Sequence, residues 1–272
     1  ILMYCYFMVF PAYQCWVSKK RFDYDYKPVI ISAVMYSVLS IIIPLVAVMK
    51  LNPTSSVRIS FMLFTETTIC LPFYLYNIHF RQLISNRKTV LKQWKFLILF
   101  QTPSVVHALS YIILSSMDRI MIGKMAGNAE TGIYSLATTI ASVITILSIS
   151  ANQVLKPWRY QKMEKHNYKI IRSTSNVLLV TFGVAIILWV LVAPDIIHLL
   201  FPTDYYQAIW VIPPVSISVF FVFLYSMFVD IEEYYYKTKY TMYATTISAV
   251  ANIIMNYFGI KLWGYIACAY TT

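Results

Sequence analysis

The chain has 272 residues, of which 59% are hydrophobic and 12% are charged, and its formal net charge is +11 at pH 7. Soluble globular proteins usually have about 45–50% apolar and about 25% charged residues, so this composition excludes an ordinary soluble domain. In a soluble chain such a charge would favour nucleic acid as the partner. Here the cations flank apolar segments, which orientation in a membrane and contact with anionic lipid explain more simply, so we expect no nucleic-acid partner.

About nine apolar segments follow one another, most of them close to the roughly 20 residues with which a helix crosses a bilayer core about 30 Å thick. They are continuous apolar runs, unlike the alternating segments of a transmembrane β-barrel. We therefore predict an all-α, polytopic bundle of transmembrane helices. The predicted spans are 1–18, 28–49, 59–78, 97–117, 131–155, 174–194, 206–229, 240–260 and a truncated span that starts at 262.

The basic residues fall mainly in every second gap between these segments. All but five of the 22 Lys and Arg lie within 19–27, 81–95, 156–172 and 237–239. Short loops rich in Lys and Arg stay in the cytoplasm, so these gaps are predicted to be cytoplasmic and residue 1 to lie on the outer side. The longest such gap, 79–96, is either an amphipathic surface helix or a linker between two bundles. The other five basic residues are Lys50, Arg58, Arg119, Lys124 and Lys261.

The four cysteines, Cys5, Cys15, Cys70 and Cys268, are scattered along the chain without a Cys-x-x-Cys pair. This spacing supports neither a metal site nor a disulfide framework. We expect them to be small apolar residues of helices, and we predict no metal and no cofactor.

Three predicted spans carry polar residues at steps of three or four, which places them on one face of each helix. Hydrocarbon penalises polar groups unless they are paired or face water, so these faces favour a bundle around a hydrated cleft. The alternative for the Ser and Thr positions is close helix packing with hydrogen bonds between helices. The three sets are Ser104, His107, Tyr111, Ser115 and Asp118; Ser135, Thr138, Ser142, Thr145 and Asn152; and Thr245, Ser248, Asn252 and Asn256.

Ionisable residues in or beside the spans are the main functional candidates. Asp118 and Arg119 follow the fourth predicted span, close to Lys124. They form either an interfacial ion pair or a cationic contact for an anionic substrate, because a guanidinium binds phosphate oxygens in a bidentate way. His107 is either a neutral hydrogen-bond partner or a protonation switch. Glu66, a lone carboxylate in the third span, is the candidate for a coupling proton or cation.

A proline pair interrupts the seventh predicted span. Pro213 and Pro214 cannot donate the backbone hydrogen bond to the residue four positions earlier, so we expect the helix to kink or unwind there. Broken helices are common in transporters, although membrane enzymes contain them too.

Two long stretches resemble a known family. Residues 107–140, HALSYIILSSMDRIMIGKMAGNAETGIYSLATTI, and residues 210–272 resemble the polysaccharide flippases of the multidrug/oligosaccharidyl-lipid/polysaccharide exporter superfamily. The resemblance rests on extended similarity and not on a short catalytic motif. It implies two helical lobes that rock between inward and outward openings. Residues 1–78 would then be the last helices of a first lobe, 79–96 the linker between lobes, and 97–272 a second lobe whose last helix is cut short.

The resemblance also implies a function. A flippase of this kind moves undecaprenyl-diphosphate-linked oligosaccharides from the cytoplasmic to the outer face of the bacterial cytoplasmic membrane by alternating access, coupled to a cation gradient. We expect a monomer in the bilayer whose partners are the lipid-linked oligosaccharide, a polysaccharide polymerase and a chain-length regulator. No catalytic residue is expected. The substrate-binding candidates are Arg119, Asp118, His107, Lys124, Ser142, Asn152, Asn252 and Asn256.

Two other functions stay open. One is a multidrug exporter of the same superfamily, which the Ser and Thr residues favour less than sugars. The other is a membrane enzyme of polysaccharide assembly, such as a polymerase or an acyltransferase, which would need a clustered acid, base or nucleophile at a membrane face. The outer acidic residues Asp195 and Asp204 have no evident partner in the sequence.

The charge distribution predicts a topology that can be tested directly. In a protein without its native cysteines, single cysteines at positions 128 and 203 should react with an impermeant thiol reagent in intact cells, whereas those at 23 and 167 should react only after the membrane is opened. The reverse pattern would contradict the orientation, and a mixed pattern would contradict the spans.

Overall fold

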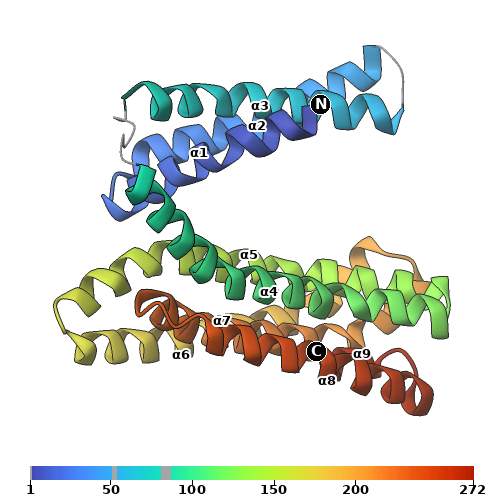
Figure 1. Ribbon diagram of the computed structural model, residues 1–272. Helices are drawn as coiled ribbons and strands as arrows, with labels where there is room; N and C mark the ends of the chain where they lie inside the picture. The colour runs from blue at the N-terminus through green and yellow to red at the C-terminus, as the bar shows by residue number, and fades with distance from the viewer. Residues whose placement is uncertain (1, 51–53, 81–86) are drawn as a thin grey trace. The chain divides into compact units, whose positions relative to one another are not determined.

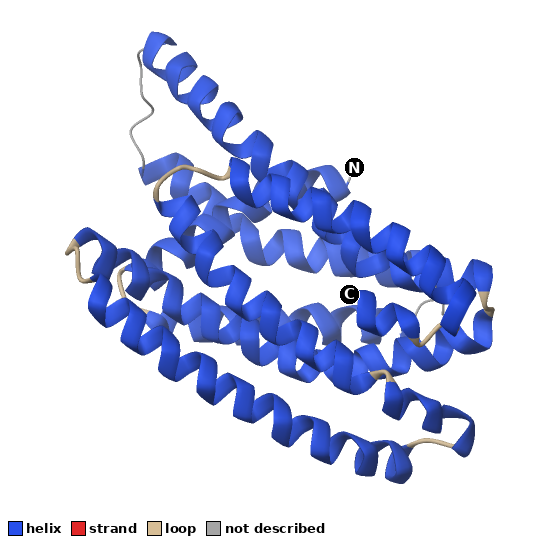
Figure 2. Ribbon diagram, turned by 90° about the horizontal axis from the view of Figure 1, so that it is seen from below, coloured by secondary structure: helices blue, strands red, loops and turns tan. Residues whose placement is uncertain are grey.

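The computed structural model describes residues 2–50, 54–80 and 87–272, which fold as helices joined by short turns (Figure 1, Figure 2). No strand occurs among these residues, and the predicted all-α class is confirmed. The helices are α1 (Leu2–Phe22), α2 (Tyr26–Lys50), α3 (Ser55–Phe80), α4 (Arg87–Met125), α5 (Asn128–Glu164), α6 (Tyr168–Leu200), the 3-10 helix η1 (Thr203–Trp210), α7 (Ile212–Tyr234), α8 (Lys239–Trp263) and α9 (Ala267–Thr271).

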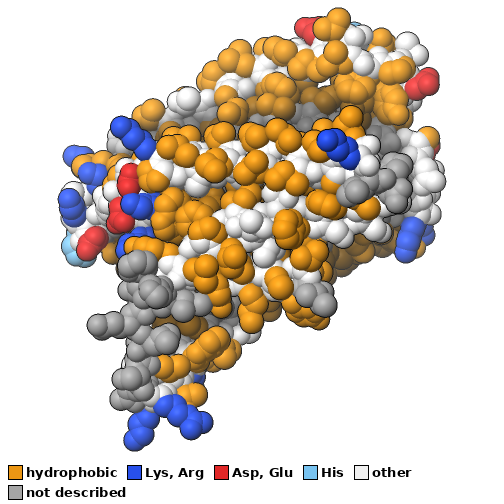
Figure 3. Space-filling model, turned by 90° about the horizontal axis from the view of Figure 1, so that it is seen from above, with side chains coloured by type: hydrophobic (Ala, Val, Ile, Leu, Met, Phe, Trp, Pro, Cys, Tyr) orange, Lys and Arg blue, Asp and Glu red, His pale blue; other side chains and the backbone are white. Residues whose placement is uncertain are grey.

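Among the described residues, six helices, α2 to α7, are long and apolar enough to cross a membrane; for α3 this holds for the part up to Tyr76. Helices α1 and α8 coincide with predicted spans but are not among these six, and α8 carries many Thr, Tyr and Asn residues. On the face drawn in Figure 3, apolar side chains cover most of the surface and the charged side chains lie mainly towards its margins. The chain is therefore a polytopic helical bundle, and the number of spans stays a prediction.

The chain divides into two compact units, one ending at Leu91 and the other beginning at Lys92. The basic segment 79–96 is thus partly helical, because α4 begins at Arg87, while residues 81–86 lie outside the described part of the chain. The assignment of the units to two lobes and a linker stays a prediction.

In the first unit, α3 packs against both α1 and α2. Its core is largely aromatic. The ring of Tyr13 stacks on Tyr36 with 5.7 Å between centroids and meets Phe73 edge-on at 5.0 Å, and Trp16 lies 4.8 Å from Phe73. Aromatic rings bury a large area each, so a few of them can hold three helices together.

In the second unit, α5, α6, α7 and η1 pack around two apolar clusters. One cluster is centred on Phe182 and Phe223, whose ring centroids lie 4.5 Å apart. The other brings Ile122 and Tyr134 together with Ile197 and Val211. This packing is the rigid part of the unit against which the polar side chains of α4 and α8 are set.

The predicted span 206–229 is interrupted beside the proline pair, because η1 ends at Trp210 and α7 begins at Ile212. Pro213 and Pro214 do not kink a continuous helix; they occupy the first turn of α7, where the N–H groups have no partner within the helix in any case. Helix α4 continues beyond 117 to Met125, so Asp118 lies inside it, towards its end. The chain turns at Gly127, whose φ of 131° suits glycine and few other residues.

Candidate functional site

Polar side chains join α4 to α8 at three levels of the second unit. His107 Nδ1 lies 3.0 Å from Thr245 Oγ1, and Ser110 Oγ lies 3.0 Å from Thr246 Oγ1. Further along α4, the amide of Asn256 donates to Asp118 Oδ1 at 2.7 Å. We call this row of contacts the α4–α8 seam.

Two hydrogen bonds meet at Thr245 on the seam. Its hydroxyl lies 2.8 Å from the carbonyl of Thr241 and 3.0 Å from Nδ1 of His107. When the hydroxyl donates to Thr241, Nδ1 of His107 is the donor to Thr245. His107 acts here as a structural hydrogen-bond partner between two helices.

Asp118 is the most enclosed acidic group of the seam, with 3% of the residue exposed. Besides Asn256, it accepts hydrogen bonds from the hydroxyl of Tyr134 at 2.8 Å and from the hydroxyl of Thr272 at 2.7 Å. These donors come from three different segments, α5, α8 and the residue that follows α9. One carboxylate therefore ties four segments of the unit together.

A second ring of hydrogen bonds supports this carboxylate. Asn256 also donates to Asn252 Oδ1 at 3.0 Å, and Asn252 donates to the backbone carbonyl of Thr271 at 3.3 Å. The hydroxyl of Thr271 in turn donates to Asn256 Oδ1. Asn252 and Asn256 are almost fully buried, so both amides are held in one orientation by these partners.

All the donors to Asp118 are neutral. A buried charge is costly unless it is paired or well hydrogen-bonded, and no Lys or Arg of the described residues pairs with this one. The charge of Asp118 is therefore stabilised by hydrogen bonds from neutral groups alone.

Arg119 and Lys124 lie apart from this cluster. Asp118 and Arg119 do not form the ion pair that the sequence left open, because consecutive residues point about 100° apart around a helix. The guanidinium of Arg119 is exposed and donates to Thr138 Oγ1 at 2.9 Å on α5. Lys124 is also exposed, near the end of α4.

The remaining candidates are distributed over the unit. Ser142 donates to the carbonyl of Thr139 in its own helix. Asn152 is half-buried on α5, and its Oδ1 has no partner. On α4, Tyr111 and Ser115 are exposed, whereas Ser110 is buried. The face of α4 that contacts α8 is therefore rotated slightly from the predicted polar face and includes Ser110.

Glu66 belongs to the first unit. It is 7% exposed, and its carboxylate interacts with the hydroxyl of Tyr36, which also contacts Tyr6. A cavity of about 460 Å³ between α2 and α3 is lined by Glu66 and Arg58 among others. Glu66 is thus a buried carboxylate beside a cavity, as a coupling site would require, and that role stays a prediction.

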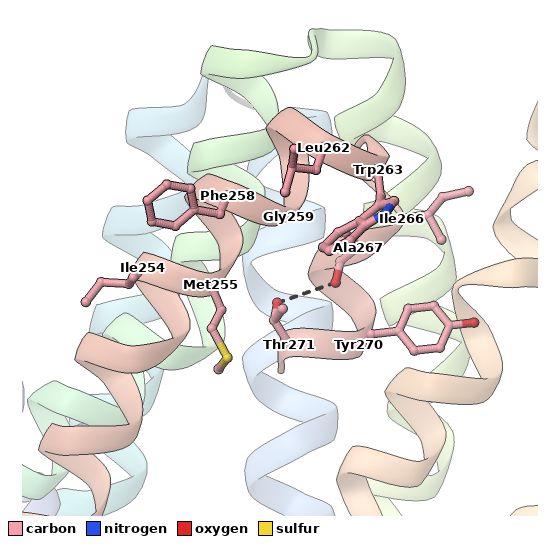
Figure 4. A pocket seen from close by; sticks show the side chains of 10 residues that line it. All are labelled: Ile254, Met255, Phe258, Gly259, Leu262, Trp263, Ile266, Ala267, Tyr270 and Thr271. Carbon is pink, nitrogen blue, oxygen red and sulfur yellow. Dashed lines mark hydrogen bonds between the residues drawn. The ribbon is translucent and has the colours of Figure 1, made fainter.

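An apolar pocket lies beside the supporting hydrogen bonds, between α8 and α9 (Figure 4). Its volume is about 690 Å³, and its walls include Phe258, Trp263 and Tyr270. Thr271 belongs both to this wall and to the hydrogen bonds around Asn256, and its hydroxyl also reaches the carbonyl of Ala267 at 3.5 Å. The polar cluster therefore borders an apolar surface.

Sequence reasoning did not find several of these residues. In the sequence, Tyr134 resembles a residue of the membrane interface and Thr272 resembles a terminal residue. Only the fold shows that both donate hydrogen bonds to Asp118. A buried Arg159, paired with Asp230, was counted only as a loop cation. The acidic residues between 230 and 233 and the basic residues at the end of α5 have opposite charges. This complementarity was the sequence feature that could have predicted the pair.

Two family models match this chain. One, MatE, matches residues 103–258, and the other, described as "Polysaccharide biosynthesis protein", matches residues 1–161. Each match covers more than half of the sequence. The chain belongs to the multidrug/oligosaccharidyl-lipid/polysaccharide exporter superfamily. It is accordingly a multi-pass membrane protein of a transporter family.

A comparison with curated proteins gives a more distant relative. Over 117 residues the chain is 26% identical to a protein of Haemophilus influenzae described as "Uncharacterized membrane protein". The match covers 42% of this chain and 28% of that protein. No solved structure matches the chain.

The Asp118 cluster predicts a difference in stability between two neighbouring residues. Asp118→Ala removes the acceptor of the Tyr134 hydroxyl and of one N–H of the Asn256 amide, which should lower the free energy of unfolding by about 1–3 kcal/mol. Arg119→Ala removes an exposed contact and should change it by less than about 0.5 kcal/mol. Unfolding of the purified proteins in detergent would measure both. Equal stability of the two variants would show that the cluster does not hold the unit together.

Proposed function

We propose that the full-length protein is a flippase that moves undecaprenyl-diphosphate-linked oligosaccharides across the bacterial cytoplasmic membrane by alternating access. The observation that carries the proposal is the pair of family matches, one to a model for polysaccharide biosynthesis and one to MatE, which overlap on a single chain. Polymerase and chain-length regulator proteins are the partners that such a substrate would require.

The physical task is to carry sugar hydroxyls and a diphosphate through hydrocarbon. Each hydrogen bond lost on the way costs several kcal/mol unless the protein replaces it, on the order of the penalty for burying an unpaired hydroxyl or amide. Hydroxyls and amides along α4, α5 and α8 can supply that replacement, among them Ser110, Thr245 and Asn252. The prenyl chain needs no such help and stays in lipid.

Arg119 is the proposed contact for the diphosphate, with Lys124 beside it. Its guanidinium is exposed and donates to the neutral Thr138, and no carboxylate of the described residues forms an ion pair with it. A planar guanidinium can bind two phosphate oxygens at once.

Asp118 is the proposed site of coupling to a proton or cation, with Glu66 as a second candidate in the first unit. A carboxylate inside a membrane protein is a functional candidate by default, because keeping it there is costly. Neutralising Asp118 would weaken its hold on Tyr134, Asn256 and Thr272, and so would loosen α4 from α5 and α8. Binding of an ion and rearrangement of the helices would thereby be linked.

A multidrug exporter is the second candidate function. The MatE match favours it, because that match covers 103–258, which holds the seam and Arg119. The two functions differ in what Arg119 does: an anionic diphosphate needs this cation, whereas a cationic drug would be repelled by it.

The flippase proposal predicts a graded response at Arg119. Arg119→Ala should abolish export of surface polysaccharide at normal abundance in the membrane, and Arg119→Lys should restore only part of it, because an ammonium binds phosphate as a point charge. Staining of surface polysaccharide, normalised to the amount of membrane protein, measures the effect.

Lys261→Ala provides the matched control. Lys261 is another exposed cation predicted on the outer side, and it bonds to Tyr257 in its own helix. Export should be normal in this variant. Full export by a well-expressed Arg119→Ala would remove Arg119 from the mechanism, and an equal loss in both variants would point to general surface charge.

A further inference from the structure

A groove on the second unit lies between α6 and α7, away from the residues assigned to transport. Its volume is about 430 Å³, within the range of roughly 300–1,000 Å³ typical of small-molecule sites. It is lined on α6 from Tyr168 to Leu179 and on α7 from Leu224 to Tyr235. Since Tyr168 hydrogen-bonds to Tyr235 at 2.9 Å, one end of the groove is closed by this pair.

The two ends of the groove differ in polarity. The end near Tyr168 is lined by Arg172, Ser175 and Asn176, whereas the other end is lined by Leu179 and Leu224. Arg172 is exposed, and no carboxylate of the described residues forms an ion pair with it. One end therefore offers a cation with hydroxyl and amide groups, and the other offers only hydrocarbon.

The position of the groove matches one leaflet of a bilayer. Arg172 precedes the predicted span 174–194, and the groove then follows α6 into that span. Only residues 174–179 of the groove on α6 lie in that span, about 8 Å at 1.5 Å per residue, and residues 168–173 precede it. Half of a hydrocarbon core about 30 Å thick is about 15 Å, so the apolar end of the groove reaches about halfway through one leaflet and can hold the upper part of an acyl chain.

We propose that this groove binds an anionic phospholipid of the leaflet at the basic face, with the phosphate at Arg172, Ser175 and Asn176 and an acyl chain along Leu179 and Leu224. A phosphodiester carries one negative charge, which the single guanidinium complements. A polyprenyl diphosphate fits less well, because its chain is longer than one leaflet and its headgroup carries more charge than one Arg balances. This ligand is a lipid of the membrane and not the transported substrate, so the proposal is independent of the one above.

Native mass spectrometry of the purified full-length protein, titrated with dioleoyl-phosphatidylglycerol or dioleoyl-phosphatidylcholine, tests the proposal. The wild type should bind phosphatidylglycerol about fivefold more tightly, the factor equivalent to the roughly 1 kcal/mol that one basic residue contributes near anionic lipid. Arg172→Gln should remove this preference. Ser175→Trp, which fills the groove, should weaken binding of both lipids.

Lys169→Gln is the matched control, because it removes the same charge from the same helix but does not line the groove. It should keep the preference for phosphatidylglycerol. Equal losses in Lys169→Gln and Arg172→Gln would show diffuse attraction to the basic face and overturn the site. Unchanged binding in a folded Ser175→Trp, as judged by its elution in gel filtration, would overturn it too, as would displacement of phosphatidylglycerol by undecaprenyl phosphate at lower concentration.

Discussion

One electrostatic constraint links several helices of the second unit, the burial of the Asp118 carboxylate without a cationic partner among the described residues. Such a group is tolerated only when donors surround it, and here the donors are Tyr134, Asn256 and Thr272. Each comes from a different part of the fold. The hydrogen bonds to the single carboxylate of Asp118 thus link α5, α8 and the residue after α9 to α4.

The unit combines two kinds of helix contact. Helices α5, α6 and α7 are held by apolar packing, as in the contact of Phe182 with Phe223, whereas α4 and α8 meet through hydrogen bonds such as those of His107 and Ser110. Apolar packing between membrane helices resists separation through close van der Waals contacts, since lipid tails are as apolar as the side chains. Hydrogen-bonded side chains can exchange their partners for water or sugar hydroxyls at little net cost. This difference supports the proposal that alternating access involves the α4–α8 seam.

Much of the fold follows from composition and periodicity, because only a few kinds of backbone structure can cross a bilayer. Continuous apolar runs require helices, and the superfamily assignment agrees with the resemblance carried by residues 107–140 and 210–272. A local rule was less reliable at one helix start: Pro213 and Pro214 begin a helix and do not kink one. Sequence spacing alone does not distinguish a proline that breaks a helix from one that starts it.

Part of the candidate site was also predictable. Asp118, Asn252 and Asn256 stood out as large polar groups in apolar surroundings, and the fold does bring them together. Tyr134 and Thr272 could not be identified in this way, since tyrosine and threonine are common near membrane boundaries and their role depends on a contact with a distant helix. The role of Arg119 stays a prediction, and its contact with Thr138 could not be predicted, because it depends on how α4 is rotated against α5.

The most direct test of the account is a transport measurement with purified full-length protein in liposomes that contain a fluorescent lipid-diphosphate oligosaccharide. Exposure of the sugar to an impermeant reagent reports its movement between leaflets. The account predicts that the wild type moves this lipid faster than empty liposomes do, that an imposed proton or sodium gradient increases the rate, and that Asp118→Asn loses the response to the gradient. Movement no faster than in empty liposomes, together with export of an organic cation by the same preparation, would contradict it.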